Sequence, residues 1–158
     1  MSDIYTLIKA DHATHRDLLN RIAETTGASD DRKAAWNTFF HDVKAHAAAE
    51  EETFYSKLMS KTWGQDAARH SVSEHKDLDD LMEELHEMDM ADGAWLTKFK
   101  TLKHDYEHHM DEEENEVFGR AKEVIDDTDT QAFGDRFKAR KSEELELVEE
   151  KREDHLED

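Results

Sequence analysis

Apolar residues recur every three or four positions along four stretches of this chain, which is the spacing of amphipathic α-helices. Gly27, Gly64 and Gly93 lie among turn and capping residues between these stretches, where one helix can end and the next begin. Connections this short place neighbouring helices antiparallel. The pattern therefore predicts an all-α fold, an up-down-up-down four-helix bundle over residues 1–125.

The chain after residue 125 has a different character. Two aspartates, a threonine and a further aspartate at 126–129 indicate a break followed by a helix cap, and the remainder is highly charged. Phe133 and Phe137 are the apolar residues that could dock the start of this segment on the bundle. We expect residues 126–158 to form an additional charged C-terminal helix that packs on the bundle or extends from it.

The apolar stripe of each predicted bundle helix is interrupted near its middle, mostly by histidine and glutamate. In two of the helices the apolar stripe itself contains the pattern His-x-x-x-Glu. Residues four positions apart share one face of a helix, so each pattern offers an imidazole and a carboxylate to one inward point. The interior polar residues predicted in this way are His12, His46, Glu50, His75, His109 and Glu113.

The register of the fourth helix decides between two overlapping pairs. Steps of three or four residues back from His109 meet only aromatic and aliphatic residues, whereas the same steps back from His108 meet polar residues. His109 and Glu113 are therefore predicted to face the core, and His108 and Glu112 to face solvent.

The depth of these residues points to a metal site. They lie between 11 and 20 residues from the nearest of the three glycines, so that all six fall in one middle layer of the bundle. Buried carboxylates and imidazoles must be paired or must bind cations. Mixed nitrogen and carboxylate ligation suits iron, manganese or zinc, and two glutamates favour a dinuclear site. The alternative is that some of these are core histidines satisfied by hydrogen bonds, or that they lie at the surface.

Composition narrows the choice of partners. The chain has 21 basic and 41 acidic residues, a net charge of −20 that disfavours nucleic acid and anionic membranes. No cysteine is present, which excludes disulfides, thiolate ligands and thiol catalysis. No basic leader with an apolar run and no stretch long enough to span a bilayer is seen, so we expect a cytoplasmic protein.

Four short blocks resemble the hemerythrin-like (HHE cation-binding) family over residues 4–125. In chain order the blocks are Ile8-Lys-Ala-Asp-His12, His46-Ala-Ala-Ala-Glu-Glu51 followed by Phe54-Tyr55, Glu74-His-Lys-Asp-Leu78, and His108-His-Met-Asp-Glu-Glu-Glu-Asn-Glu-Val-Phe118. The resemblance implies a non-haem diiron centre completed by an oxo, hydroxo or water bridge. In it Glu50 and Glu113 would bridge the ions and His46 and His109 would bind terminally. His12 would ligate one ion, and His75 the same ion or the other.

The chain departs from the oxygen-carrying members of that family, which use five histidines, two of them four residues apart on the third helix. Ser71 and Asp79 occupy the positions four residues from His75, so one ion lacks a ligand. Either that ion is under-coordinated or another residue replaces the missing histidine. The possible additional ligands, or partners of the ligands, are His15, Tyr55, His70 and His108.

An open coordination position makes O₂, peroxide or NO the expected ligand. One hypothesis is a binding or sensing protein that captures O₂ or NO reversibly or holds iron. Another is an enzyme with catalase-like, peroxidase-like or ferroxidase-like activity, and the smaller number of histidines favours peroxide chemistry. The remaining alternative is a metal-free acidic interaction module. We expect a monomer or weak dimer in each case.

Overall fold

A computed structural model of the 158-residue chain describes residues 3–60, 62–125 and 127–157. Within these ranges the side chains of residues 62–63, 123–124, 127–129 and 148–157 are not described. The described backbone is helical and contains no strand. Among the described helices, none is long and apolar enough to cross a lipid bilayer.

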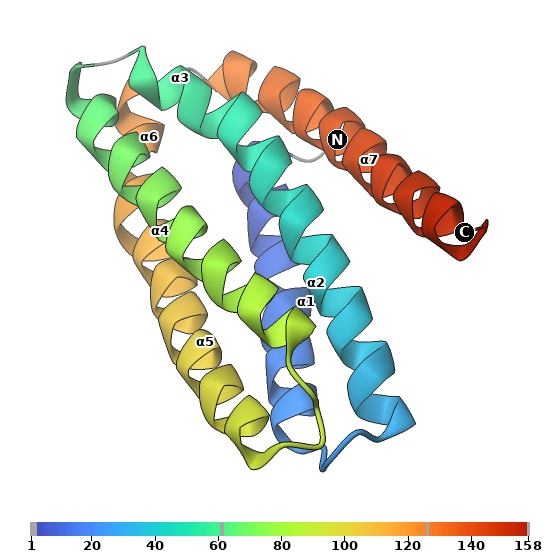
Figure 1. Ribbon diagram of the computed structural model, residues 1–158. Coiled ribbons are helices and arrows are strands. Elements are labelled where there is room, and N and C mark those ends of the chain that lie inside the picture. The colour runs from blue at the N-terminus through green and yellow to red at the C-terminus, as the bar shows by residue number, and fades with distance from the viewer. Residues whose placement is uncertain (1–2, 61, 126, 158) are drawn as a thin grey trace.

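Four long helical segments run antiparallel along one axis, which confirms the predicted up-down-up-down bundle (Figure 1). The four main helices are α1 (Ile4–Ala23), α2 (Asp30–Glu50), α4 (Thr62–Glu87) and α5 (Gly93–Glu112). Two of them continue past a π-helical turn. These continuations are η1 (Glu51–Tyr55) with α3 (Ser56–Met59), and η2 (Glu113–Val117) with α6 (Phe118–Val124).

Side-chain caps fix where three of the helices begin. The side chains of Asp3, Ser29 and Asp92 accept hydrogen bonds from backbone N–H groups in the first turns of α1, α2 and α5. Gly27 lies in the connection between α1 and α2 with φ of 56°, a left-handed conformation that glycine adopts without strain. The expected breaks at Gly27 and Gly93 are therefore confirmed.

Gly64 lies in the first turn of α4, which begins at Thr62. The sequence therefore placed the break between the two helices a few residues too late. The role of Gly64 is close packing. A Cβ atom at this position would lie 2.1 Å from the backbone oxygen of Leu58 in α3, far inside van der Waals contact. The close approach of α4 to the backbone of α3 is therefore possible only with glycine here.

Replacing Gly64 with alanine should destabilise the fold by about 2–3 kcal/mol, because the backbone must move to relieve the overlap with Leu58. Urea denaturation measures this change. Gly119→Ala is the matched control, since nothing lies within 4 Å of a Cβ built there within α6, and it should be neutral or stabilising. Equal stability of the two variants would contradict the described packing of α3 on α4.

The bundle has two apolar clusters with a polar layer between them. One cluster is built around Trp36, Trp95 and Phe99, and the other around Phe54 and Phe118. Along α1 the two clusters are separated by buried histidines, and the other three helices supply buried His or Glu at the same level. The apolar ends exclude water from the middle of the bundle, where the polar residues lie.

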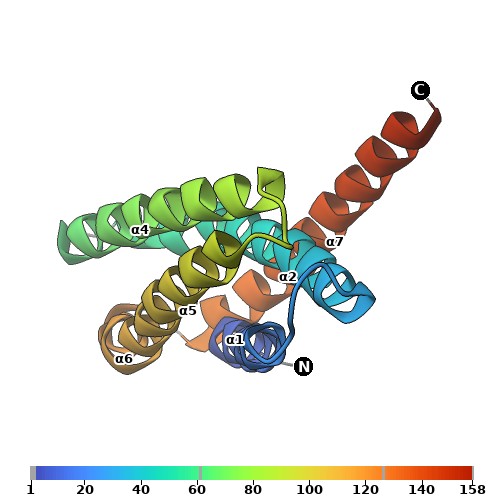
Figure 2. The same ribbon diagram turned by 60° about the horizontal axis from the view of Figure 1, so that its bottom comes forward.

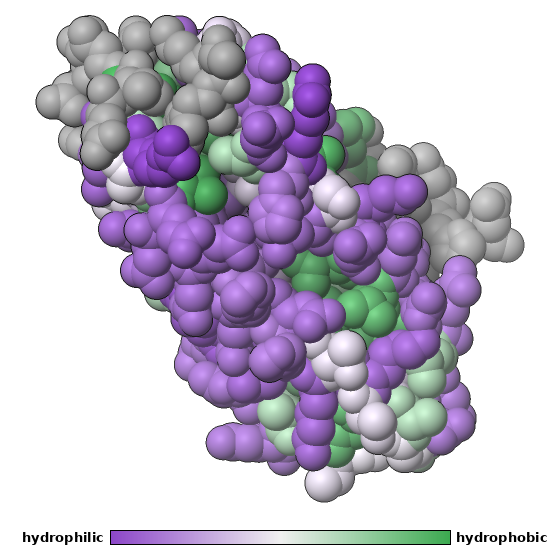
Figure 3. Space-filling view, turned by 90° about the vertical axis from the view of Figure 1, so that its left-hand side faces the viewer, coloured by the Kyte–Doolittle hydropathy of each residue, from purple (hydrophilic) through white to green (hydrophobic). Residues whose placement is uncertain are grey.

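The additional helix α7 (Asp127–Glu157) packs against α2 and α1 and then projects beyond them (Figure 2). Phe133 and Phe137 are buried at this contact, at the positions expected to dock it. The opposite side of the bundle, over α4 and α5, is covered mostly by hydrophilic side chains (Figure 3). Helix α7 thus shields the bundle on one side only.

Candidate metal centre

The six interior residues predicted from the sequence meet in the middle layer of the bundle. None of the six side chains is more than 8% exposed. Their ligand atoms form two overlapping groups, one of Glu50, His75, His109 and Glu113 and one of His12, His46 and Glu50, and within each group the atoms lie within 4.8 Å of one another. The four bundle segments therefore bring these side chains to one place.

Each of the two carboxylates lies between two histidines and directs one oxygen towards each. Glu50 directs Oε2 to within 3.0 Å of His46 Nε2 and Oε1 to within 3.5 Å of His75 Nε2. Glu113 directs Oε1 to within 3.3 Å of His12 Nε2 and Oε2 to within 3.8 Å of His109 Nε2. The two glutamates lie between a His12–His46 pair and a His75–His109 pair.

The outer nitrogens of three of these histidines are held by carboxylates that the sequence reasoning did not single out. Nδ1–H of His46 donates to Asp11 at 2.7 Å, and Nδ1–H of His109 donates to Glu74 at 3.0 Å. His75 donates in the same way to Glu51 at 3.1 Å. Such bonds fix the tautomer and direct Nε2 inward, as in many metal sites. The only signal in the sequence was that each carboxylate is adjacent to a predicted ligand.

The two π-helical turns coincide with the two glutamates. The α-helical part of the second segment ends at Glu50, and Glu113 is the first residue of η2. A π turn holds more residues than an α turn and is frequent at functional sites. Neither turn contains glycine or proline, so the sequence pattern did not indicate them.

The electrostatics of the layer show what these groups require. Burial and the charge of Glu50 raise the pKa of Glu113 well above its ordinary value. Burial alone would lower the pKa of His75, but Glu50 and Glu51 outweigh it and raise that pKa to about 9. Burial and the neighbouring His46 lower the pKa of His12 to about 2. With protein groups alone, the layer must hold protons to limit repulsion between its carboxylates.

The hydrogen bonding within the layer is incomplete. All four carboxylate oxygens of Glu50 and Glu113 are buried without a hydrogen-bond partner among the described residues. A buried carboxylate that accepts no hydrogen bond is costly, whereas a cation between the oxygens and the inward Nε2 atoms would satisfy them together. The donor set therefore fits divalent metal ions.

Comparison with known proteins agrees with this geometry. The family model described as the hemerythrin HHE cation binding domain matches residues 3–121, most of the chain. The chain belongs to this family. The structure is also similar to the crystal structure of a hemerythrin HHE cation binding domain-containing protein from Mycobacterium kansasii, with a TM-score of 0.85, 22% identity, and coverage of 96% of this chain and 92% of that chain. No curated protein matches the chain significantly.

His15 is placed in this HHE domain as a partner of neighbouring side chains. Its Nε2–H donates to Asp42 at 2.6 Å, and its Nδ1 accepts the hydroxyl hydrogen of Tyr106 at 2.7 Å. Both ring nitrogens are thus occupied, which argues against His15 as the replacement for the missing histidine. Lys141 of α7 lies 3.0 Å from both Asp42 and Asp11, so it supports two of the carboxylates that hold the histidines.

The other three candidates differ in their distance from the centre of the HHE domain. Tyr55 is buried with its ring 5.5 Å from that of His75, and its hydroxyl has no hydrogen-bond partner within the described part of the chain. The side chains of His70 and His108 are 58% and 71% exposed and face Glu112. Their exposure argues against either histidine as a direct ligand of the buried centre. That Tyr55 is an additional ligand, or a partner of the ligands, remains a prediction.

Proposed function

We propose that this HHE domain holds two iron ions in its polar layer and uses them to bind and remove peroxide. The observation that carries the proposal is the convergence of four inward Nε2 atoms on four carboxylate oxygens that lack partners. Zinc or manganese could occupy the same donor set. Membership of the hemerythrin HHE family favours iron among these metals.

The geometry favours one assignment of ligands. Two side-chain atoms that hold the same metal ion lie close together, typically about 3 Å apart. His75 Nε2 and His109 Nε2 are 3.1 Å apart, and His46 Nε2 is 3.0 Å from Glu50 Oε2. We therefore propose that His75 and His109 would hold one ion and that His12 and His46 would hold the other, with Glu50 and Glu113 within reach of both. Each ion would then have two nitrogen and two oxygen ligands from the protein, which leaves positions for small molecules.

Bound iron would supply Lewis acidity and electron exchange with peroxide, and two peroxide molecules would yield one O₂ and two water molecules. The protein residues supply the surroundings. Asp11, Glu51 and Glu74 hold three imidazoles in the tautomer that presents Nε2. The two apolar clusters close the layer to water at both ends of the bundle.

Purified protein reconstituted anaerobically with ferrous iron should contain about two ions per chain and should evolve O₂ from added peroxide. Elemental analysis and an oxygen electrode measure these quantities, and metal-free protein is the control. Metal uptake without O₂ evolution would remove the peroxide proposal. An oxygenated spectrum that reverses under vacuum would then support O₂ carriage. Absence of any metal would favour the acidic interaction module.

A further inference from the structure

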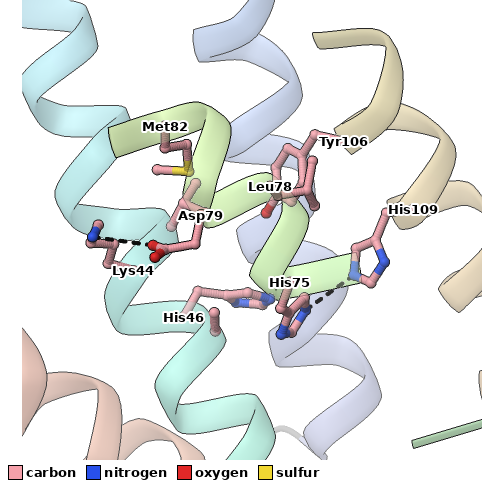
Figure 4. A pocket seen from close by; sticks show the side chains of 10 residues that line it. Lys44, His46, His75, Leu78, Asp79, Met82, Tyr106 and His109 are labelled. Carbon is pink, nitrogen blue, oxygen red and sulfur yellow. Dashed lines mark hydrogen bonds and ion pairs between the residues drawn. The ribbon is translucent and has the colours of Figure 1, made fainter. Parts of the chain in front are cut away.

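A small pocket of about 30 Å³ lies between α2, α4 and α5 (Figure 4). Its walls are mainly apolar and include Val43, Leu78 and Met82, together with the ring of Tyr106. At its inner end the pocket reaches histidines of both assigned pairs, but His12 does not line it. The histidines that line it are His46, His75 and His109.

The outer end of the pocket is crossed by an ion pair between two helices. Lys44 Nζ on α2 lies 3.1 Å from Asp79 Oδ1 on α4 and also pairs with Glu83. Figure 4 shows this pair on the far side of the pocket from His75 and His109. A wider surface groove of about 380 Å³ shares Lys44, Ala47, His75 and Asp79 with the pocket, so these residues mark the boundary between the two spaces.

Asp79 occupies one of the positions four residues from His75 where a further histidine could stand. Its side chain is 49% exposed and pairs with Lys44, so it does not point into the centre. The pocket is lined by both histidines of one assigned pair, His75 and His109, but by only His46 of the other pair. A small molecule in the pocket would therefore be adjacent to the ion assigned to these two histidines.

We propose that this pocket is the access path and binding site for the small ligand on the His75–His109 side of the centre, and that the Lys44–Asp79 pair restricts access to it. The inference rests on the proposed metal function. It names the ligand class as an uncharged molecule of about two heavy atoms, such as hydrogen peroxide, O₂ or NO.

Size and charge support this ligand class. A cavity needs about 10–15 Å³ to hold one buried water molecule. The pocket of about 30 Å³ therefore has room for about two water-sized groups. Asp79 and Glu83 carry two negative charges against the one positive charge of Lys44, so the outer end of the pocket has a net negative charge. The chain as a whole carries a net charge of −20. Anions such as azide are therefore disfavoured at this opening relative to neutral molecules.

The first experiment narrows the pocket with Ala47→Leu and compares it with Ala48→Leu. Both alanines are half-buried neighbours on α2 and line the outer groove, but only Ala47 lines the pocket. After ferrous reconstitution to equal metal content, stopped-flow absorbance measures NO association. Ala47→Leu should slow association by about tenfold or more, while Ala48→Leu should stay within about twofold of the unmodified protein.

The second experiment removes the ion pair with Lys44→Met, which keeps a long side chain. NO association should become about threefold faster or more, because the cross-helix pair no longer closes the outer end. Lys98→Met is the control, since Lys98 pairs with Glu84 away from the pocket and should leave the rate unchanged. This variant keeps the test decisive if Ala47→Leu lowers metal content.

The outcomes separate the two proposals. Suppose that metal content is normal, that NO associates at the same rate in Ala47→Leu and Ala48→Leu, and that Lys44→Met does not increase the rate. These results would overturn the access path and leave the proposed metal centre intact. Faster association of azide than of NO in the unmodified protein would overturn the assignment to uncharged ligands. Failure of the unmodified protein to take up metal would overturn the proposed function, and the access path with it.

Discussion

Glu113→Ala should abolish the proposed dinuclear site, lowering metal affinity by about 100-fold or more, whereas Glu112→Ala should leave metal content unchanged. Glu113 is 1% exposed, and its two oxygens face His12 and His109, so its loss removes a ligand from both assigned ions. Glu112 is one residue earlier, but its oxygens face the exposed His70 and His108. The two variants therefore remove the same type of side chain from adjacent positions, one facing the buried layer and the other facing exposed histidines.

Metal content per chain after reconstitution and dialysis measures this difference. Circular dichroism of the metal-free variants should show the same helix content, because both changes place a good helix former in a helix. Glu50→Ala should behave like Glu113→Ala, since Glu50 also faces both histidine pairs. Equal metal loss in Glu112→Ala and Glu113→Ala would mean that the centre lies elsewhere.

Removal of metal should lower the melting temperature by about 10 °C at pH 8, since metal at about a thousandfold excess over its dissociation constant stabilises a fold by about 4 kcal/mol. Ions held in the polar layer would join four helical segments and would satisfy the carboxylate oxygens of Glu50 and Glu113, which otherwise accept no hydrogen bond from the described residues. Differential scanning calorimetry with and without chelator measures the shift. An unchanged melting temperature would show that the ions do not stabilise the bundle.

The pH dependence of stability should have opposite signs in the two forms. In the metal-free protein the pKa of His75 is raised from 6.5 to about 9, so its protonated form stabilises the fold below pH 6.5 and this contribution is lost as pH rises through 9. The raised pKa of Glu113 acts in the same direction. Metal-free protein should therefore become less stable between pH 6.5 and 9.

The metal-loaded protein should instead lose stability as pH falls, because coordination requires deprotonated imidazole and carboxylate and protons displace the ions. Melting temperatures measured across this pH range in both forms test the prediction. Parallel curves would indicate that metal does not bind through these groups.

The period of the apolar residues was sufficient to predict the bundle and the six residues that meet inside it. Those residues are the polar exceptions in otherwise apolar stripes, and helix geometry alone determines that His46 and Glu50 share a face. The same reasoning separated His109 from His108, and the structure buries the first and exposes the second. A pattern of this kind is strong because it depends only on the helical repeat.

Contacts that depend on the alignment of one helix against another could not be predicted. Asp11 is adjacent to His12 in the sequence, yet its carboxylate holds His46 on α2. His15 appeared to be a spare ligand, but its two nitrogens are occupied by Asp42 and Tyr106 from two other helices. Such pairs depend on shifts of about one residue, 1.5 Å, along neighbouring helices, which no single-helix period determines.

Lys141 lies beyond residues 3–121, the part of the chain that matches the family model, yet it contacts Asp11 and Asp42 beside the candidate metal centre. A fragment cut before α7 would retain every assigned ligand yet leave two partly buried negative charges beside His46 and His15 without their shared counter-ion. Metal-binding measurements should therefore use the chain with α7 included. Anything that binds or displaces α7 would also change the electrostatic potential at the candidate metal centre, because Lys141 would move away from Asp11 and Asp42.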